Sequence, residues 1–88
     1  MRKNSAKLFD ALGNNIRFNI VDYLCSGEKC VCCIFKKLNR PQNLVSHHLA
    51  ILRENGLIMD RKDGKWVYYR LNKKSLEKLK KVLNNLIY

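Results

Sequence analysis

The sequence has few acidic residues and no long apolar run, and both shortages bear on the class of protein. Asp and Glu number 7 against 18 Lys and Arg in 88 residues, which gives a formal net charge of +11. So large a basic excess points to a polyanionic partner such as DNA, RNA or an anionic membrane surface. No apolar run approaches the length of a membrane span, and the first seven residues hold no apolar signal-peptide core. We therefore expect a cytoplasmic protein that has no membrane partner.

Catalytic motifs and a disulfide framework are also missing. The sequence has no Ser/His/Asp set, no phosphate-binding loop and no βαβ pattern of the kind that carries a thiol–disulfide catalyst, so we do not expect an enzyme. Three of the four cysteines stand within residues 30–33, too close together to staple distant segments as small secreted domains require. The length suits one domain, 1–88, whose small core would gain from oligomerisation.

The first half of the chain has the apolar spacing of helices. Stripes at residues 8–12, 16–24 and 34–38 predict three helices, the first with Ser5 placed to cap it. The turn Asn39-Arg40-Pro41 follows, and a helix over Gln42 to Asn55 is predicted next, with Gly56 at its end. Two helices joined by a short turn form the outline of a helix-turn-helix.

The second half changes period. Leu57 to Arg61 and Trp66 to Leu71 read as strands flanking Lys62-Asp63-Gly64-Lys65, and Asp-Gly is a strong hairpin signal. A last helix, about Lys73 to Ile87, has a narrow apolar seam that suits packing across a dimer, formed by Leu76, Leu79, Leu83 and Leu86. The predicted fold is mainly α (α+β): a winged helix-turn-helix with a two-stranded β-hairpin wing and terminal dimerisation helices.

Two groups of side chains in this fold are predicted to contact DNA. The outer side of the second helix of the motif would meet base edges through its N-terminal residues. These residues are Gln42, Asn43, Ser46 and His47. Basic residues of the hairpin would contact phosphates or the minor groove. They are Arg61, Lys62 and Lys65. The alternative for both groups is that they form ordinary solvated surface and do not contact DNA.

The segment Cys30-Val31-Cys32-Cys33 places three thiols just before the helix-turn-helix. Thiolates are soft ligands for thiophilic ions, and amides at a helix N-terminus lower thiol pKa values. Three interpretations stay open: a metal or metalloid site at Cys30, Cys32 and Cys33, a redox pair formed by Cys30 and Cys33, or small apolar side chains without a chemical role. Cys25, apart from the cluster, fits the last of these.

The chain resembles the ArsR/SmtB family of metal-responsive repressors over about Leu8 to Leu71, and its last helix matches in character. Four segments carry the resemblance: Leu8 to Gly13, Glu28 to Cys32, Ser46 to Leu57 and Asp63 to Leu71. The resemblance implies a homodimeric transcriptional repressor that binds a palindromic operator in double-stranded DNA. It also implies release from that operator by a thiophilic metal or metalloid such as As(III), Sb(III), Cd(II) or Pb(II), with Cys30 and Cys32 among the ligands.

The sequence departs from the family pattern at two places. Arsenic sensors of this type resemble Cys-Val-Cys-Asp-Leu-Cys, but here Phe35 stands at the third thiol position and Cys33 where that pattern has Asp. Zinc sensors of the family use His and carboxylate ligands on the last helix, which here contains only Glu77. A zinc site there is therefore not expected. A thiol-redox regulator of the same fold and a basic architectural DNA-coating protein with inert cysteines are the rival functions.

Overall fold

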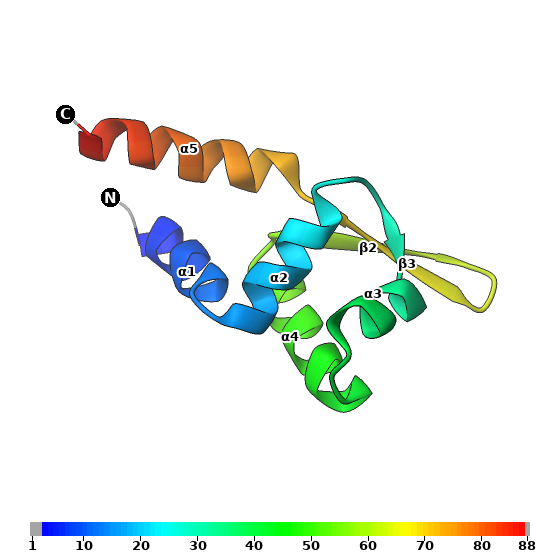
Figure 1. The fold of residues 1–88 in the computed structure, drawn as a ribbon. Coiled ribbons are helices and arrows are strands. Elements are labelled where there is room, and N and C mark those ends of the chain that lie inside the picture. The colour runs from blue at the N-terminus through cyan, green and yellow to red at the C-terminus, as the bar shows by residue number, and fades with distance from the viewer. Residues whose placement is uncertain (1–2, 88) are drawn as a thin grey trace.

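The structure, a computed structural model, describes residues 3–87, which form five helices and a three-stranded antiparallel sheet (Figure 1). None of the helices in this range is long and apolar enough to cross a membrane. The elements in chain order are α1 (Lys3–Leu12), α2 (Asn15–Leu24), β1 (Lys29–Cys30), α3 (Val31–Leu38), α4 (Gln42–Glu54), β2 (Ile58–Asp63), β3 (Trp66–Leu71) and α5 (Lys73–Ile87).

The predicted helix-turn-helix is confirmed as α3, a three-residue turn and α4. The turn begins at Asn39, whose φ of 50° is left-handed and whose N–H donates to the carbonyl of Phe35, which ends α3. Pro41 is the N-cap of α4, and Gly56, one residue beyond the C-cap, has a φ of 73°. Left-handed backbone at these two positions is what Asn and Gly accept most easily, so the local sequence fixes where both helices end.

The sheet has one strand more than the two-stranded wing that the sequence predicts. The strand order is β1-β3-β2, and β1 pairs with β3 through Lys29 opposite Tyr69 and Cys30 opposite Tyr68. A strand of two residues has no alternation of polar and apolar side chains, so periodicity cannot reveal it. The predicted two-stranded wing is confirmed as β2 and β3, and β1 is a third strand on the edge of β3 that the hairpin leaves open.

Two local expectations need correction. The helix α1 already begins at Lys3, so Ser5 lies within it as a buried residue and is not its N-cap. The hairpin connection is shorter than Lys62 to Lys65, because Lys62 and Asp63 continue β2 and pair with β3. The turn itself has two residues, and Gly64 takes a φ of 61° at its first position, where glycine is favoured.

The core lies between the helices and one face of the sheet, and one face of α4 is part of it. Val45, Leu49 and Leu52 on α4 are at most 2% exposed, as the helical spacing predicts. The other core residues come from the remaining four helices, both hairpin strands and the connection before β2: Leu8, Ala11, Ile20, Val21, Leu24, Ile34, Leu57, Ile58, Tyr69 and Leu79. The helix α5 packs against α1 at the end of the molecule away from the wing (Figure 1). The buried face of α4 therefore directs its opposite face to solvent.

A polar contact fixes α4 against the first two helices. Arg17 on α2 donates from Nε to the carbonyl of Ala11 at 2.6 Å and from Nη1 to Nδ1 of His48 at 3.0 Å. His48 is 7% exposed, and its ring accepts this bond only while Nδ1 carries no proton. Burial, together with the nearby Arg17 and His47, lowers the pKa of His48 below its ordinary value of 6.5. The native structure therefore holds this ring neutral.

Stability is expected to fall as the pH drops through and below 6.5, the ordinary value for His48. In that range the unfolded chain binds a proton that the folded ring resists, so protonation favours unfolding. Denaturant titrations on either side of this pH measure the slope. His48→Asn keeps an acceptor for Arg17 and should flatten the slope, whereas His47→Gln, at the exposed neighbour, should keep it. Equal slopes in the wild type and His48→Asn would show that another group titrates.

Candidate functional site

The exposed face of α4 holds the predicted base-reading residues. All four are exposed, and they occupy the N-terminal half of the helix: Gln42, Asn43, Ser46 and His47. Leu44, between them, is partly buried, and its N–H donates to the Asn43 side chain at 3.0 Å. His48, the residue after His47, is buried and bonded to Arg17, so it packs in the protein and does not belong to the exposed face. The structure thus presents a polar helix face at one surface of the molecule.

The wing carries the predicted basic contacts at the far end of the hairpin. Lys62 and Lys65 are exposed, and the Nζ of Lys65 lies 5.6 Å from the centre of the Trp66 ring. The tight turn at Gly64 holds the two strands together to their tips. Lysine is a flexible point charge, so these two side chains suit phosphate contacts better than base recognition.

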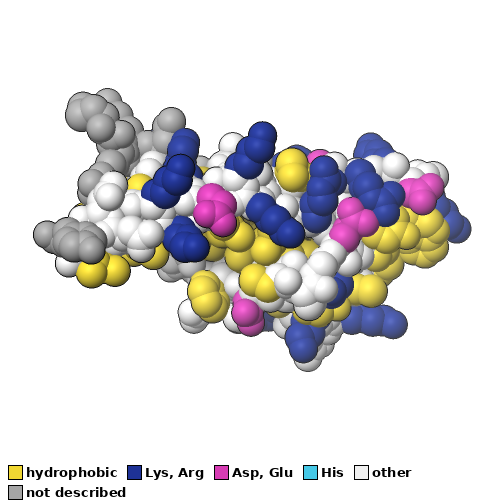
Figure 2. All heavy atoms as spheres, turned by 90° about the horizontal axis from the view of Figure 1, so that it is seen from above, with side chains coloured by type: hydrophobic (Ala, Val, Ile, Leu, Met, Phe, Trp, Pro, Cys, Tyr) yellow, Lys and Arg dark blue, Asp and Glu magenta, His cyan; other side chains and the backbone are white. Residues whose placement is uncertain are grey.

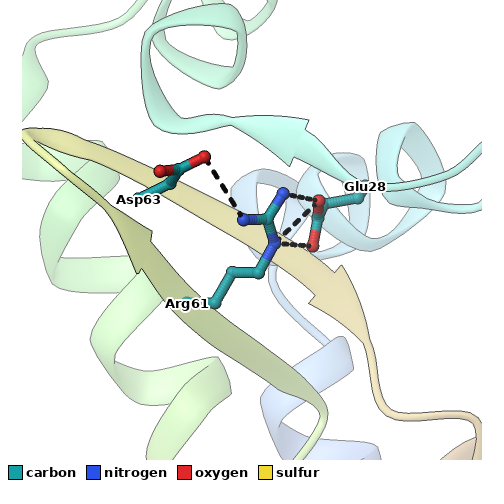
Figure 3. Close-up of polar contacts among 3 residues, drawn as sticks. All are labelled: Glu28, Arg61 and Asp63. Carbon is teal, nitrogen blue, oxygen red and sulfur yellow. Dashed lines mark hydrogen bonds and ion pairs between the residues drawn. The ribbon is translucent and has the colours of Figure 1, made fainter.

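Arg61 differs from these lysines because it is tied within the protein. Its guanidinium donates to Glu28 from Nε at 3.0 and 3.1 Å and from Nη2 at 2.7 Å (Figure 3). It also lies 4.4 Å from the centre of the Tyr68 ring and 4.0 Å from a carboxylate oxygen of Asp63. The Arg61 hydrogen bonds hold the pKa of Glu28 below its ordinary value. A DNA contact by Arg61 stays a prediction, and one edge of its guanidinium is already committed to Glu28.

The thiols lie where β1 meets α3. Cys30 is the extended N-cap of α3, and its sulfur lies 3.0 Å from that of Cys32. Cys33 is exposed in the first turn of α3, and Cys25 is exposed directly after α2. Within residues 3–87, no three His, Cys, Asp or Glu side chains are grouped to hold a metal ion. The structure therefore brings two of the three predicted ligands, Cys30 and Cys32, into contact. The third, Cys33, would have to change position to join them in one site.

The two paired thiols differ in acidity. A hydrogen bond from the Cys32 thiol lowers the pKa of Cys30 below its ordinary value of 9.0, and backbone N–H groups at the start of α3 act in the same direction. The same pairing raises the pKa of Cys32, as expected when one proton is shared by two sulfurs. Cys30 is thus the thiol that deprotonates first, and a thiolate at this position is the nucleophile and ligand of the pair.

Other lysines lie away from α4 and the wing. Five are exposed on the outer side of α5: Lys73, Lys74, Lys78, Lys80 and Lys81. Figure 2 shows Lys and Arg side chains along much of the face that carries α5, with acidic side chains scattered between them. The basic charge of the chain is therefore not confined to the predicted DNA contacts.

Two residues of this region were not singled out from the sequence. Glu28, just before β1, holds Arg61, and Arg17 holds His48 on α4. Both contacts join residues more than 30 positions apart, so helical or strand periodicity gives no sign of them. Only the presence of Glu28 beside the thiols, among few acidic residues, could have drawn attention to it.

Comparison with known proteins shows a match to a family of bacterial regulatory proteins. The family described as "Bacterial regulatory protein, arsR family" matches residues 14–60. The arsenical resistance operon repressor of Escherichia coli K12 is 49% identical over 67 residues, which are 75% of this chain and 57% of the repressor. The chain thus spans less than two thirds of the length of that relative.

Two solved structures resemble the whole fold. HlyU from Vibrio cholerae is 35% identical with a TM-score of 0.80, covering 98% of this chain and 97% of HlyU. The homodimeric winged helix-turn-helix DNA-binding domain Mb0332 from Mycobacterium bovis is 27% identical with a TM-score of 0.78, covering 94% and 78% of the two chains. The Escherichia coli relative is named a repressor, HlyU a transcriptional activator and Mb0332 a possible ArsR-family transcriptional regulator, which agrees with the expectation of a regulator rather than an enzyme. The family match and the Escherichia coli relative together show that this chain belongs to the ArsR family of bacterial regulatory proteins.

Proposed function

We propose that residues 1–88 form one DNA-binding domain that represses transcription by placing α4 in the major groove of a palindromic operator. The observation that carries this proposal is the division of α4 into two faces. Val45, Leu49 and Leu52 anchor one face in the core, while Gln42 and Asn43 lie exposed on the other near the N-terminus of the helix. Asn and Gln amides pair bidentately with adenine, and the net charge of +11 supplies attraction to phosphates.

Substitutions on α4 and on the wing should weaken DNA binding in different ways. Gln42→Ala or Asn43→Ala should cost on the order of 1–3 kcal/mol on the operator and much less on random DNA. Lys62→Ala or Lys65→Ala should weaken both and reduce the salt slope by about one unit per lost phosphate contact. Binding titrations at several salt concentrations measure both effects. Identical behaviour of the two classes would favour the architectural DNA-coating protein.

The proposal includes a homodimer that joins two half-sites. The predicted leucine seam of α5 divides in the structure, because Leu79 is buried within the protomer while Leu83 and Leu86 are 49% and 62% exposed. Ile87 extends this apolar surface at 80% exposure. A monomer gains nothing by exposing these side chains to water, and the similar Mycobacterium bovis domain is homodimeric. The end of α5, beside α1, is therefore the proposed dimer surface.

Leu83→Asp combined with Leu86→Asp should give a folded monomer that loses operator binding, because these side chains are exposed in the protomer and one half-site gives little affinity. Asn84→Asp with Asn85→Asp adds the same charges at exposed positions between them and should leave the dimer intact. Sedimentation velocity and circular dichroism measure assembly and folding. A wild-type protein that sediments as a folded monomer at micromolar concentration would contradict the dimer.

We further propose that a thiophilic metal or metalloid binds at Cys30 and Cys32 and releases the repressor. The adjacent sulfurs and the acidic Cys30 suit As(III), Sb(III), Cd(II) or Pb(II), and the Escherichia coli relative is an arsenical resistance repressor. Cys33, exposed in the same turn, is the proposed third ligand. A cytoplasmic location, where thiols stay reduced, belongs to the same proposal.

Cys30→Ser or Cys32→Ser should keep operator binding and lose release by arsenite, whereas Cys25→Ser should keep both. Thiolate binding displaces protons, so the affinity for the effector should rise with pH through the Cys30 pKa, which lies below 9.0. Ultraviolet thiolate–ligand absorption and operator release measure binding and response. Unchanged absorption in Cys33→Ser would leave a two-thiol site, and unchanged behaviour in Cys32→Ser as well would make the cluster inert.

A thiol–disulfide switch is the second candidate, favoured by the 3.0 Å separation of the Cys30 and Cys32 sulfurs. In that reaction the two thiols lose two electrons and two protons to an oxidant such as hydrogen peroxide, which is reduced to water. The sequence alone suggested Cys30 and Cys33 as the redox pair, and the structure favours Cys32 as the partner. Release by peroxide, reversed by dithiothreitol without any metal, distinguishes this switch from an ion sensor.

A further inference from the structure

The segment that carries the thiols is built into the wing as well as into the helix-turn-helix. Cys30 ends β1, where it lies opposite Tyr68 of β3, and it is also the N-cap of α3. A ligand that draws Cys30 and Cys32 together therefore acts at the point where α3 joins the sheet. Any change of backbone position at Cys30 reaches β3 through the antiparallel pairing.

A second connection runs from the same segment to β2. The Glu28 carboxylate receives three hydrogen bonds from Arg61, at 2.7, 3.0 and 3.1 Å (Figure 3). Arg61 also lies over the ring of Tyr68. Tyr68 is the residue opposite Cys30, so the strand pairing and the ion pair meet at one place. Lys62, a proposed phosphate contact, is the next residue of β2 after Arg61. The thiol segment thus connects to the basic end of the wing by way of a few side chains.

We propose that the Glu28–Arg61 ion pair is the coupling element that transmits ligand binding at Cys30 and Cys32 to the wing. This inference rests on the proposed function of the thiols as a sensor. The pair is exposed, with 47% of the Arg61 and 29% of the Glu28 side chain accessible, and exposed ion pairs add little to stability. Its bidentate geometry instead fixes orientation, which suits a positioning contact. The ligand acts by favouring a wing position that DNA does not favour.

The test compares two variants that each remove one negative charge near the wing. Glu28→Gln replaces the carboxylate by an amide, which removes the ion pair with Arg61 and its bidentate geometry. Asp60→Asn is the matched control, because Asp60 lies on β2 next to Arg61 but pairs with Arg53 of α4 at 3.4 Å. Trp66, the only tryptophan, lies in the wing and is 47% exposed, so its fluorescence reports on the wing without DNA. Each protein is titrated with arsenite while thiolate absorption, Trp66 fluorescence and operator affinity are followed.

In the wild type and in Asp60→Asn, arsenite should change the Trp66 fluorescence and weaken operator binding by a factor within the roughly 5–150-fold range typical of allosteric coupling. In Glu28→Gln the thiolate absorption should be unchanged, while the fluorescence change disappears and the loss of operator affinity shrinks to less than about threefold, below that range. The exchanged pair, Glu28→Arg with Arg61→Glu, should restore the fluorescence response. Because this last measurement needs no DNA, it is unaffected by the altered charge of the wing.

The two hypotheses fail in different ways. If wild-type protein shows no thiolate absorption with arsenite or no release, the sensor function itself is wrong. If the wild type responds and Glu28→Gln responds equally in fluorescence and in release, the ion pair does not couple the sites. A response lost equally in Asp60→Asn would also overturn the proposal, because the effect would then follow the charge of the wing and not the connection to the thiols.

Discussion

The register of β3 is the constraint on which the candidate sites depend. This strand is the middle one of the sheet, pairing with β1 on one edge and β2 on the other. Its side chains alternate, so that Tyr69 enters the core while Tyr68 lies under Arg61 and opposite Cys30. A slip of one residue would exchange the two tyrosines between the faces and expose the buried one. Burial of Tyr69 therefore also fixes the position of the thiol segment relative to the wing.

The sequence was sufficient to predict the elements that repeat a local pattern. The α4 helix follows from the spacing of Val45, Leu49 and Leu52, and the hairpin from two apolar runs around Asp-Gly. Contacts between residues far apart in the chain could not be predicted from the sequence. The strand β1 is too short to show alternation, and Glu28 contacts Arg61 across 33 positions. For the thiols, the sequence predicted a cluster, but which two sulfurs meet depends on the extended backbone of Cys30.

Arginine and lysine have separate roles around the wing. In the part of the chain that the structure describes, all three ion pairs use an arginine: Arg53 with Asp60, and Arg61 with Glu28 and Asp63. The planar guanidinium fixes the geometry of such pairs, whereas lysine is a mobile point charge. Three of the seven acidic residues are thus committed to arginines near the sheet, and the wing lysines stay exposed. Internal ion pairing near the wing therefore depends on arginines, while Lys62 and Lys65 keep their charges exposed.

The exposed lysines matter for how a small ligand could release a strongly basic protein from DNA. A net charge of +11 per chain favours phosphates whatever happens at the thiols, so an effector cannot act by cancelling charge. Under the proposed function the effector would instead change the geometry of the DNA contacts, and the hairpin tip, residues 62–65, is an exposed part of the protein that lies outside the core. In a homodimer each lost wing contact is lost twice, and the effect on affinity is squared. A modest displacement of the wing would then be enough to weaken operator binding, whereas displacement of α4 would require opening the core around Leu49 and Leu52.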